Sequence, residues 1–139
     1  MQDIHIINNK EVGDFIFAGR SLFTCKNTRS ENRFTFKVKK HKKDDIFFVS
    51  VLTNPGVYEF IGSVKRGFKF KHSAKSRISD SAQSVRVFDY LIIRLITGSL
   101  PDFIEVWHNG HCGRCGRVLT VPVSIETGYG PECLKLKNN

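Results

Sequence analysis

Apolar and polar residues alternate with a period of two over much of the first 71 residues, a pattern typical of half-buried β-strands. The clearest run is 33–40, where Phe34, Phe36 and Val38 fall on one side and basic residues on the other. Residues 46–53 (IFFVSVLT) are the most apolar run and should be central in an antiparallel meander. The remaining strands are expected at 14–24, 57–64 and 68–71, after a leading strand or arm at 1–12.

The spacing then becomes helical: Val85, Phe88 and Ile92 recur three and four residues apart. This helix should start after capping residues within 79–81 and end near Gly98. A short strand at 103–107 should follow, with one helical turn at 124–127. The pattern predicts an α+β fold: a twisted antiparallel sheet with one covering helix (residues 1–100) and a C-terminal zinc-knuckle module packed on it (residues 101–139).

A cluster of cysteines near the C-terminus has the spacing of a metal site. Cys112 and Cys115 form a Cys-x2-Cys turn next to Gly113 and Gly116, and Cys133 follows a Gly-x-Gly-Pro reversal. Such a turn aims two thiolates at one point, and a tetrahedral Zn²⁺ ion suits this ligand type and spacing. The predicted cofactor is therefore zinc.

The fourth ligand has to be a histidine, a carboxylate or the remaining cysteine. His108 and His111 are the local histidines, and His108 is preferred because His111 adjoins Cys112 and neighbouring residues rarely converge on one ion. Cys25 lies in an expected strand and is interpreted as a structural, half-buried thiol. The predicted ligand set is His108, Cys112, Cys115 and Cys133.

Other roles for the cysteines were weighed against structural zinc. Residues 1–20 show no secretory signal pattern, so we expect reduced thiols rather than two disulfides, and a cytoplasmic location in a bacterial host. A redox pair would open a helix in a βαβ unit, whereas this turn is rich in glycine. A catalytic zinc site would keep a position open, and four protein ligands would close it.

The stretch from Cys112 to Cys133 resembles a small zinc-motif family through the pattern CGRCGRxLTxPxSIExGxGPEC. The family occurs largely in proteins of bacteriophages and other mobile elements, and its function is uncharacterised. The chain departs from the family at Val123, where an acidic residue is expected. The resemblance covers roughly the last 30 residues and implies a zinc fold and a phage or mobile-element origin, but no activity.

Charge adds a second functional signal. The chain carries a net charge of +9 over 139 residues, which suggests a polyanionic partner, nucleic acid above all. Windows 33–43 and 63–77 each hold six Lys or Arg and no acidic residue. With two arginines of the Cys-x2-Cys turn, the candidate nucleic-acid-binding residues are Arg33, Lys37, Lys39, Lys40, Lys65, Arg66, Lys69, Lys71, Lys75, Arg77, Arg114 and Arg117.

Alternating lysines also solubilise a strand face, and alternating phenylalanines are first of all core residues. The discriminating feature is therefore aromatic exposure, because outward aromatic rings beside lysines would favour stacking on unpaired bases. Residues 72–79 offer hydroxyls and cations before a helix start, which suits either a phosphate-binding corner or an ordinary loop.

Two functions follow from the sequence. The first is a nucleic-acid-binding zinc protein that binds single strands, or strands without strong sequence preference, through a basic sheet face. The alternative is a protein-binding inhibitor or host-takeover factor that engages an acidic surface of a host protein. No catalytic motif stands out, so no enzymatic activity is expected. No apolar run reaches the roughly 20 residues of a membrane span, and no membrane partner is expected.

Overall fold

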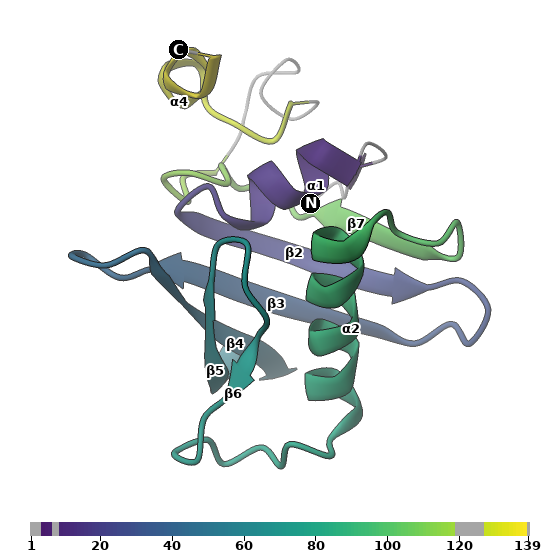
Figure 1. The fold of residues 1–139 in the computed structure, drawn as a ribbon. Helices are drawn as coiled ribbons and strands as arrows, with labels where there is room; N and C mark the ends of the chain where they lie inside the picture. Colours follow the sequence, from purple (N-terminus) through teal and green to yellow (C-terminus); the bar gives the residue numbers. More distant parts are fainter. Residues whose placement is uncertain (1–3, 7–8, 119–126, 139) are drawn as a thin grey trace.

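The structure is a computed structural model that describes residues 4–6, 9–118 and 127–138 (Figure 1). Strands dominate the first half of the chain, and the longest helix follows them. In chain order, the described elements are β1 (Ile4–Ile6), α1 (Asn9–Ile16), β2 (Arg20–Asn27), β3 (Arg33–Lys40), β4 (Ile46–Asn54), β5 (Val57–Lys65), β6 (Lys71–His72), α2 (Gln83–Thr97), β7 (Ile104–His108) and α4 (Pro131–Asn138).

The described strands form a seven-stranded antiparallel sheet with the order β1-β7-β2-β3-β4-β5-β6. The chain runs as a meander from β2 to β6, and β7 then returns to lie between β1 and β2. Residues 104–108, which the sequence assigned to the C-terminal module, therefore lie inside the sheet. The architecture confirms the predicted α+β class.

Helix α2 packs across one face of the sheet, and the core lies between them (Figure 1). The ring of Phe88 in α2 is 5.0 Å from the ring of Phe36 in β3 and 5.0 Å from that of Phe70. Phe36 and Val38 are fully buried, whereas Lys37 between them is exposed. The side of the sheet turned away from α2, which carries Lys37, is called the outer face below.

The central strands match their predictions because β3 alternates cleanly and β4 is strongly apolar. The strand predicted at 33–40 is β3, and the apolar run at 46–53 lies in β4. The run at 57–64 lies in β5, and a helix ending at Gly98 is confirmed by α2, whose Arg94 carbonyl accepts the Gly98 N–H.

The single strand predicted at 14–24 is wrong. Val12, Phe15 and Ile16 have helical spacing and are buried on one side of α1, so the helix continues to Ile16. β2 begins only at Arg20, after Gly19 at a φ of 141°. Gly19 is needed there because a Cβ would stand 2.8 Å from the Arg114 carbonyl oxygen. That close approach joins the start of β2 to the C-terminal region.

The strand predicted at 68–71 and the serine cap are also wrong. Phe68 lies in a turn and is 65% exposed, and the strand is reduced to the two residues of β6. The N-cap of α2 is Ala82 without a side-chain cap, because the Ser79 hydroxyl accepts the N–H of Ser81 instead. The predicted turn at 124–127 falls mainly on residues 119–126, outside the described residues.

Among the described helices, none combines the length and the apolar character that a membrane crossing requires.

Candidate metal centre and nucleic-acid interface

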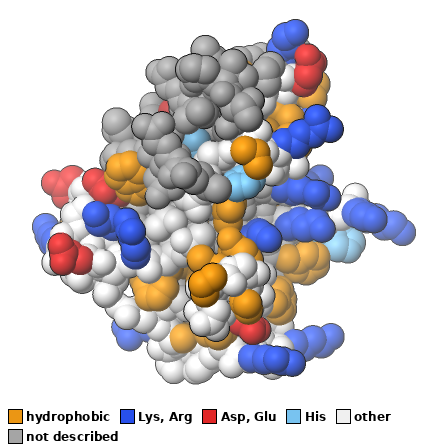
Figure 2. Space-filling model, turned by 180° about the vertical axis from the view of Figure 1, so that it is seen from behind, with side chains coloured by type: hydrophobic (Ala, Val, Ile, Leu, Met, Phe, Trp, Pro, Cys, Tyr) orange, Lys and Arg blue, Asp and Glu red, His pale blue; other side chains and the backbone are white. Residues whose placement is uncertain are grey.

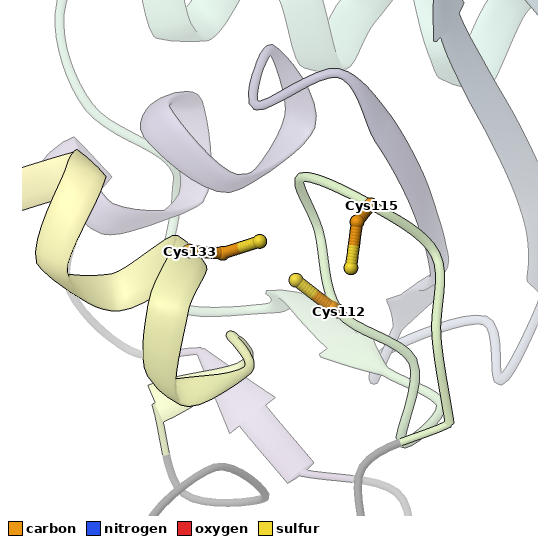
Figure 3. A group of neighbouring side chains, drawn as sticks. All are labelled: Cys112, Cys115 and Cys133. Carbon is orange, nitrogen blue, oxygen red and sulfur yellow. The ribbon is translucent and has the colours of Figure 1, made fainter.

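Three cysteine side chains from two separate segments converge on one point (Figure 3). Cys112 and Cys115 come from the turn after β7, and Cys133 comes from the first turns of α4. Their three sulfur atoms all lie within 4.8 Å of one another. Cys112 is fully buried, Cys133 is 7% exposed, and Cys115 is partly exposed. The structure therefore brings together the three cysteines that the sequence predicted as ligands.

The loop that carries Cys112 and Cys115, here called the knuckle (residues 111–118), is closed by its own backbone. The Cys112 N–H donates to the Arg117 carbonyl at 2.8 Å, and the Gly116 N–H donates to the Cys112 carbonyl at 2.8 Å. His111 and Val118 form a β-bridge at its base. Gly116 has a φ of 80°, a conformation that favours glycine. The loop thus holds two thiols in place before any ion binds.

The environments of the thiols differ. Burial raises the pKa of Cys112, but hydrogen bonds from the backbone N–H groups of Gly130, Cys115 and Arg114 outweigh it, and the net pKa lies below the usual value. Burial raises the pKa of Cys133, and the Arg114 guanidinium, whose Nη1 lies 3.9 Å from its sulfur, acts in the opposite direction. Backbone donors aimed at a sulfur atom stabilise a thiolate, which is the form that binds metal.

The sulfur geometry fits a tetrahedral metal ion. Zn–S bonds of about 2.3 Å in tetrahedral geometry place two sulfurs about 3.8 Å apart, within the observed limit. All four cysteines are free thiols in the structure, so none forms the disulfides weighed above. Within the described residues, no histidine nitrogen or carboxylate oxygen joins the group of three sulfurs.

The two candidate histidines have other surroundings. His108 ends β7 and is buried, with its ring 5.7 Å from the Phe15 ring. Its Nδ1 accepts the Gly110 N–H at 3.1 Å, which occupies the lone pair of that nitrogen. The Nδ1 atom of His111 is buried and has no hydrogen-bond partner among the described residues. The choice of His108 as the fourth ligand stays a prediction, because the structure does not bring it into the cluster.

Metal analysis of two histidine variants tests this assignment. If His108 is the fourth ligand, as the spacing predicts, we expect purified His108→Ala protein to lose most of its metal and His111→Ala protein to retain about one ion per chain. Equal metal content in the two variants would count against both histidines. Inductively coupled plasma mass spectrometry of the dialysed proteins measures the content. Loss of the ion from one variant alone would identify its histidine as the missing ligand.

Cys25 is separate from the cluster. It lies in β2 with its side chain 2% exposed, and burial raises the pKa of its thiol to about 12. A thiol with this pKa stays protonated, and therefore unreactive, until the pH approaches 12. The interpretation of Cys25 as a structural thiol agrees with this position, although the thiol is buried rather than half-buried.

Alkylation should separate Cys25 from the other three thiols. At pH 8 we expect iodoacetamide to modify the three cluster cysteines only after chelation of the metal, and Cys25 only after denaturation. Mass mapping of the modified peptides measures this order. Modification of Cys25 in the folded protein would contradict its burial.

The outer face carries a row of cations and aromatic rings that crosses five strands. The strand register aligns Arg20 with Lys39, Lys39 with Phe48, Phe48 with Ser63, and Ser63 with Lys71. Direct partners on neighbouring strands share a face and lie about 4.8 Å apart. Figure 2, which views this side, shows Lys and Arg side chains beside hydrophobic ones. The row places three cations and one ring along a single line.

Aromatic rings lie outward beside these lysines. Phe48 is 40% exposed, and its ring packs edge-on against those of His41, at 5.6 Å, and Phe60, at 6.2 Å. The Tyr58 ring supports Lys37, whose Nζ lies 4.1 Å from the ring centroid. The outer face therefore carries an exposed aromatic ring beside lysine side chains. The sequence alone could not show that this ring is exposed.

The predicted basic residues divide between this face and other places. Arg33, Lys37 and Lys39 alternate along the outer face of β3, and Lys65 and Lys71 lie on the same face of β5 and β6. Lys69 lies in the turn before β6, whereas Lys75 and Arg77 are exposed in the loop before α2. Lys40 pairs with the core residue Phe47 but is itself exposed at the end of β3.

Three predicted residues have other environments. The Arg66 Nη2 donates to the Phe17 carbonyl at 2.7 Å, so its guanidinium is tied to the core side of the sheet. Arg114 approaches Cys133, and Arg117 is exposed on the knuckle. In the segment 72–79, considered as a phosphate-binding corner, polar side chains bond to carbonyl groups of the protein. His72 Nε2 bonds the Ile78 carbonyl, and the Ser76 hydroxyl donates to the Phe60 carbonyl. This loop is held together by hydrogen bonds within itself and to β5.

Arg20, Lys26, Phe48 and Trp107 also lie on the outer face, although the sequence pattern did not identify them as candidates. Their signal was weak because β2 was assigned too early in the chain, and because β7 joins the sheet through a long-range pairing. Phe48 was visible as an outward position of the alternating β4 run, but a run of apolar residues conceals which face is buried.

Comparison with known families gives one match. The model of a family of unknown function (DUF6011) matches residues 107–136, which include His108 and the three clustered cysteines. The match agrees with the predicted resemblance to a family of unknown function and assigns no activity to the segment. Comparisons with curated proteins and with solved structures gave no match.

Proposed function

We propose that this chain is a zinc-containing nucleic-acid-binding protein of phage or mobile-element origin. It binds single strands, or strands without strong sequence preference, on the outer face of its sheet. The observation that carries the proposal is the alignment of Arg20, Lys39 and Lys71 with the exposed ring of Phe48 across five strands.

The chemistry of the outer face suits an unpaired strand. Lysines and arginines release condensed counterions when they neutralise phosphates, and this release supplies sequence-independent affinity. An exposed ring adds stacking, which tolerates every base because every base has a π-face. Lys37 is held over Tyr58 and needs little further ordering to contact a phosphate.

Zinc is the proposed ion because the three clustered cysteines offer soft thiolate ligands at a spacing that suits tetrahedral Zn²⁺. Cys112 and Cys115 would hold it from the knuckle and Cys133 from α4. The ion would join these two segments in the way that structural zinc sites stabilise small modules. The knuckle contacts β2 through the hydrogen bond from the Arg20 N–H to the Gly113 carbonyl, at 2.9 Å. The ion therefore supports the edge of the binding face.

Replacing the exposed ring tests stacking separately from charge. We expect Phe48→Ala to lower affinity for a single-stranded oligonucleotide by about 5- to 150-fold, which corresponds to about 1–3 kcal/mol per stacked base. The salt dependence should stay the same, because no cation is lost. Fluorescence polarisation over a salt series measures both quantities, with Ile96→Ala, an exposed apolar residue of α2, as the control. Equal affinity of Phe48→Ala and wild type would contradict stacking.

The proposed function itself is tested with the metal-loaded wild-type protein. Labelled single- and double-stranded DNA and RNA are titrated at several salt concentrations. Single-strand affinity that falls steeply as salt rises supports the proposal. Absence of binding at low salt would contradict the proposal. The alternative function, in which the basic face contacts an acidic surface of a host protein, would then remain.

A further inference from the structure

A pocket of about 330 Å³ lies where the knuckle meets the basic part of the outer face. Arg20 from β2 and Lys37 and Lys39 from β3 line one side, and His111 and Cys115 from the knuckle line the other. Its volume is at the lower end of the range of small-molecule sites in proteins. The pocket is therefore formed jointly by the sheet and the candidate metal centre.

Among the described residues, the positive charge of this pocket has no acidic counterpart. No acidic residue is among the described residues that line it, and Arg20, Lys37 and Lys39 form no ion pair with any described residue. Neighbouring like charges repel one another, so an anion at their centre would lower the electrostatic energy. Three cations around one small pocket favour a ligand with more than one negative charge.

The knuckle contacts Arg20, one of these cations. The Arg20 N–H is bonded to the Gly113 carbonyl, and a Cβ on Gly116 would lie 3.7 Å from the Arg20 Cβ, in ordinary van der Waals contact. Tyr58 holds Lys37 from the opposite side. His111 adds a buried Nδ1 that has no hydrogen-bond partner in the described part of the chain. Lys37, which already lies over the Tyr58 ring, loses little side-chain entropy when a ligand binds.

We propose that this pocket binds a phosphate monoester, supplied either by the terminal phosphate of a nucleic-acid strand or by a free nucleotide. A monoester carries about −1.5 to −2 charges at neutral pH, whereas each internal diester carries one, so the three cations favour the monoester. Binding of the terminal phosphate of a strand rests on the proposed function, because the row of cations through Arg20 and Lys39 would guide the strand into the pocket. Cys115 lines the pocket, so loss of the metal should weaken the site.

The test compares oligonucleotides of one sequence that carry a 5′-phosphate, a 3′-phosphate or only hydroxyl ends. We expect metal-loaded wild-type protein to bind one phosphorylated form about tenfold more tightly than the hydroxyl form, because one added charge-assisted hydrogen bond accounts for such a ratio. Arg20→Ala and Lys39→Gln should reduce this ratio to about one. Arg33→Ala, which changes the outer face away from the pocket, should weaken all forms equally and keep the ratio.

The ratio is internal to each variant, so a loss of stability in Arg20→Ala does not imitate the result, and the exposed Lys39 provides a second variant. Competition by a nucleoside monophosphate, with the unphosphorylated nucleoside as its control, tests the free-nucleotide source. Salt-dependent binding of all three oligonucleotides with a ratio of one, and no competition, would overturn the pocket proposal and leave the proposed function standing. Nucleotide binding without any oligonucleotide binding would support the pocket and overturn the proposed function.

Discussion

The Cys112→Ser protein is expected to lose its metal almost completely, from one ion per chain to near zero after dialysis. Cys112 is fully buried and accepts the backbone hydrogen bonds that stabilise a thiolate, and its sulfur lies within 4.8 Å of both other sulfurs. A serine hydroxyl is a poor ligand for an ion that prefers thiolates. Structural zinc sites of small modules are worth roughly 10–16 kcal/mol at neutral pH, so the loss of a ligand has a large effect.

The loss of metal should also loosen the C-terminal region. Knuckle and α4 are joined at the cluster, and α4 presents few buried residues of its own among those described, chiefly Cys133. We expect chelation of the wild-type protein and the Cys112→Ser substitution to produce the same fall in melting temperature. Cys25→Ala is the matched control, because it also removes a buried thiol but should keep the metal. Full metal content in Cys112→Ser, or unchanged melting after chelation, would rule out a structural metal site.

The second large effect is expected from the double substitution Lys37→Glu/Lys39→Glu, which should weaken single-strand binding by one to two orders of magnitude at about 0.1 M salt. The slope of log K against log salt is negative, and each lost phosphate contact reduces its magnitude by about 0.7 for single strands. The magnitude of the slope should therefore fall by about 1.4. Both lysines are exposed, and neither forms an ion pair with a described residue, so the fold should not change.

Charge reversal on the other side of the molecule provides the control for this effect. Arg86 is exposed on α2, the helix that covers the opposite face. Arg86→Glu should lower affinity only slightly, through the net charge, and leave the salt slope unchanged. If Lys39→Glu and Arg86→Glu weaken binding equally as single variants, the outer face is not the contact surface.

Local patterns were sufficient to predict the middle of the sheet. β3 alternates without interruption, β4 is a strongly apolar run, and the helical spacing of Val85, Phe88 and Ile92 identified α2. The Cys-x2-Cys turn predicted two converging thiols because its geometry is local, and Cys133 followed from the reversal before it. In each case the physical cause lies within about ten residues of the chain.

Long-range pairing could not be predicted in the same way. β7 lies between β1 and β2 because of contacts between residues 77 to 104 positions apart in the chain, and no residue period encodes such a neighbour. Helix α1 was hidden because Phe15 and Ile16 also suit a strand, and only their packing against the knuckle distinguishes the two. Gly113 in the knuckle shows how closely Phe15 packs, because a Cβ at that position would lie 2.7 Å from the Phe15 ring.

The same difference between local pattern and long-range pairing explains why the binding face could be predicted only in part. The alternation of β3 already placed Lys37 and Lys39 opposite Phe36, but it could not show which neighbours they would meet. The register of two strand pairs, β2–β3 and β3–β4, brings Arg20 and Phe48 beside Lys39, and a shift of one residue would have turned Phe48 inward. The meeting of Arg20 with the knuckle depends on the tertiary fold alone.

The central claim is that a nucleic-acid strand lies on the outer face, and chemical-shift mapping by NMR tests it most directly. Nitrogen-15-labelled, metal-loaded protein is titrated with a short single-stranded oligonucleotide. We predict the largest amide shifts at Arg20, Lys37, Lys39, Phe48 and Phe60, with little change along α2. Shifts concentrated on α2, or no shifts at all under low-salt conditions, would contradict the claim.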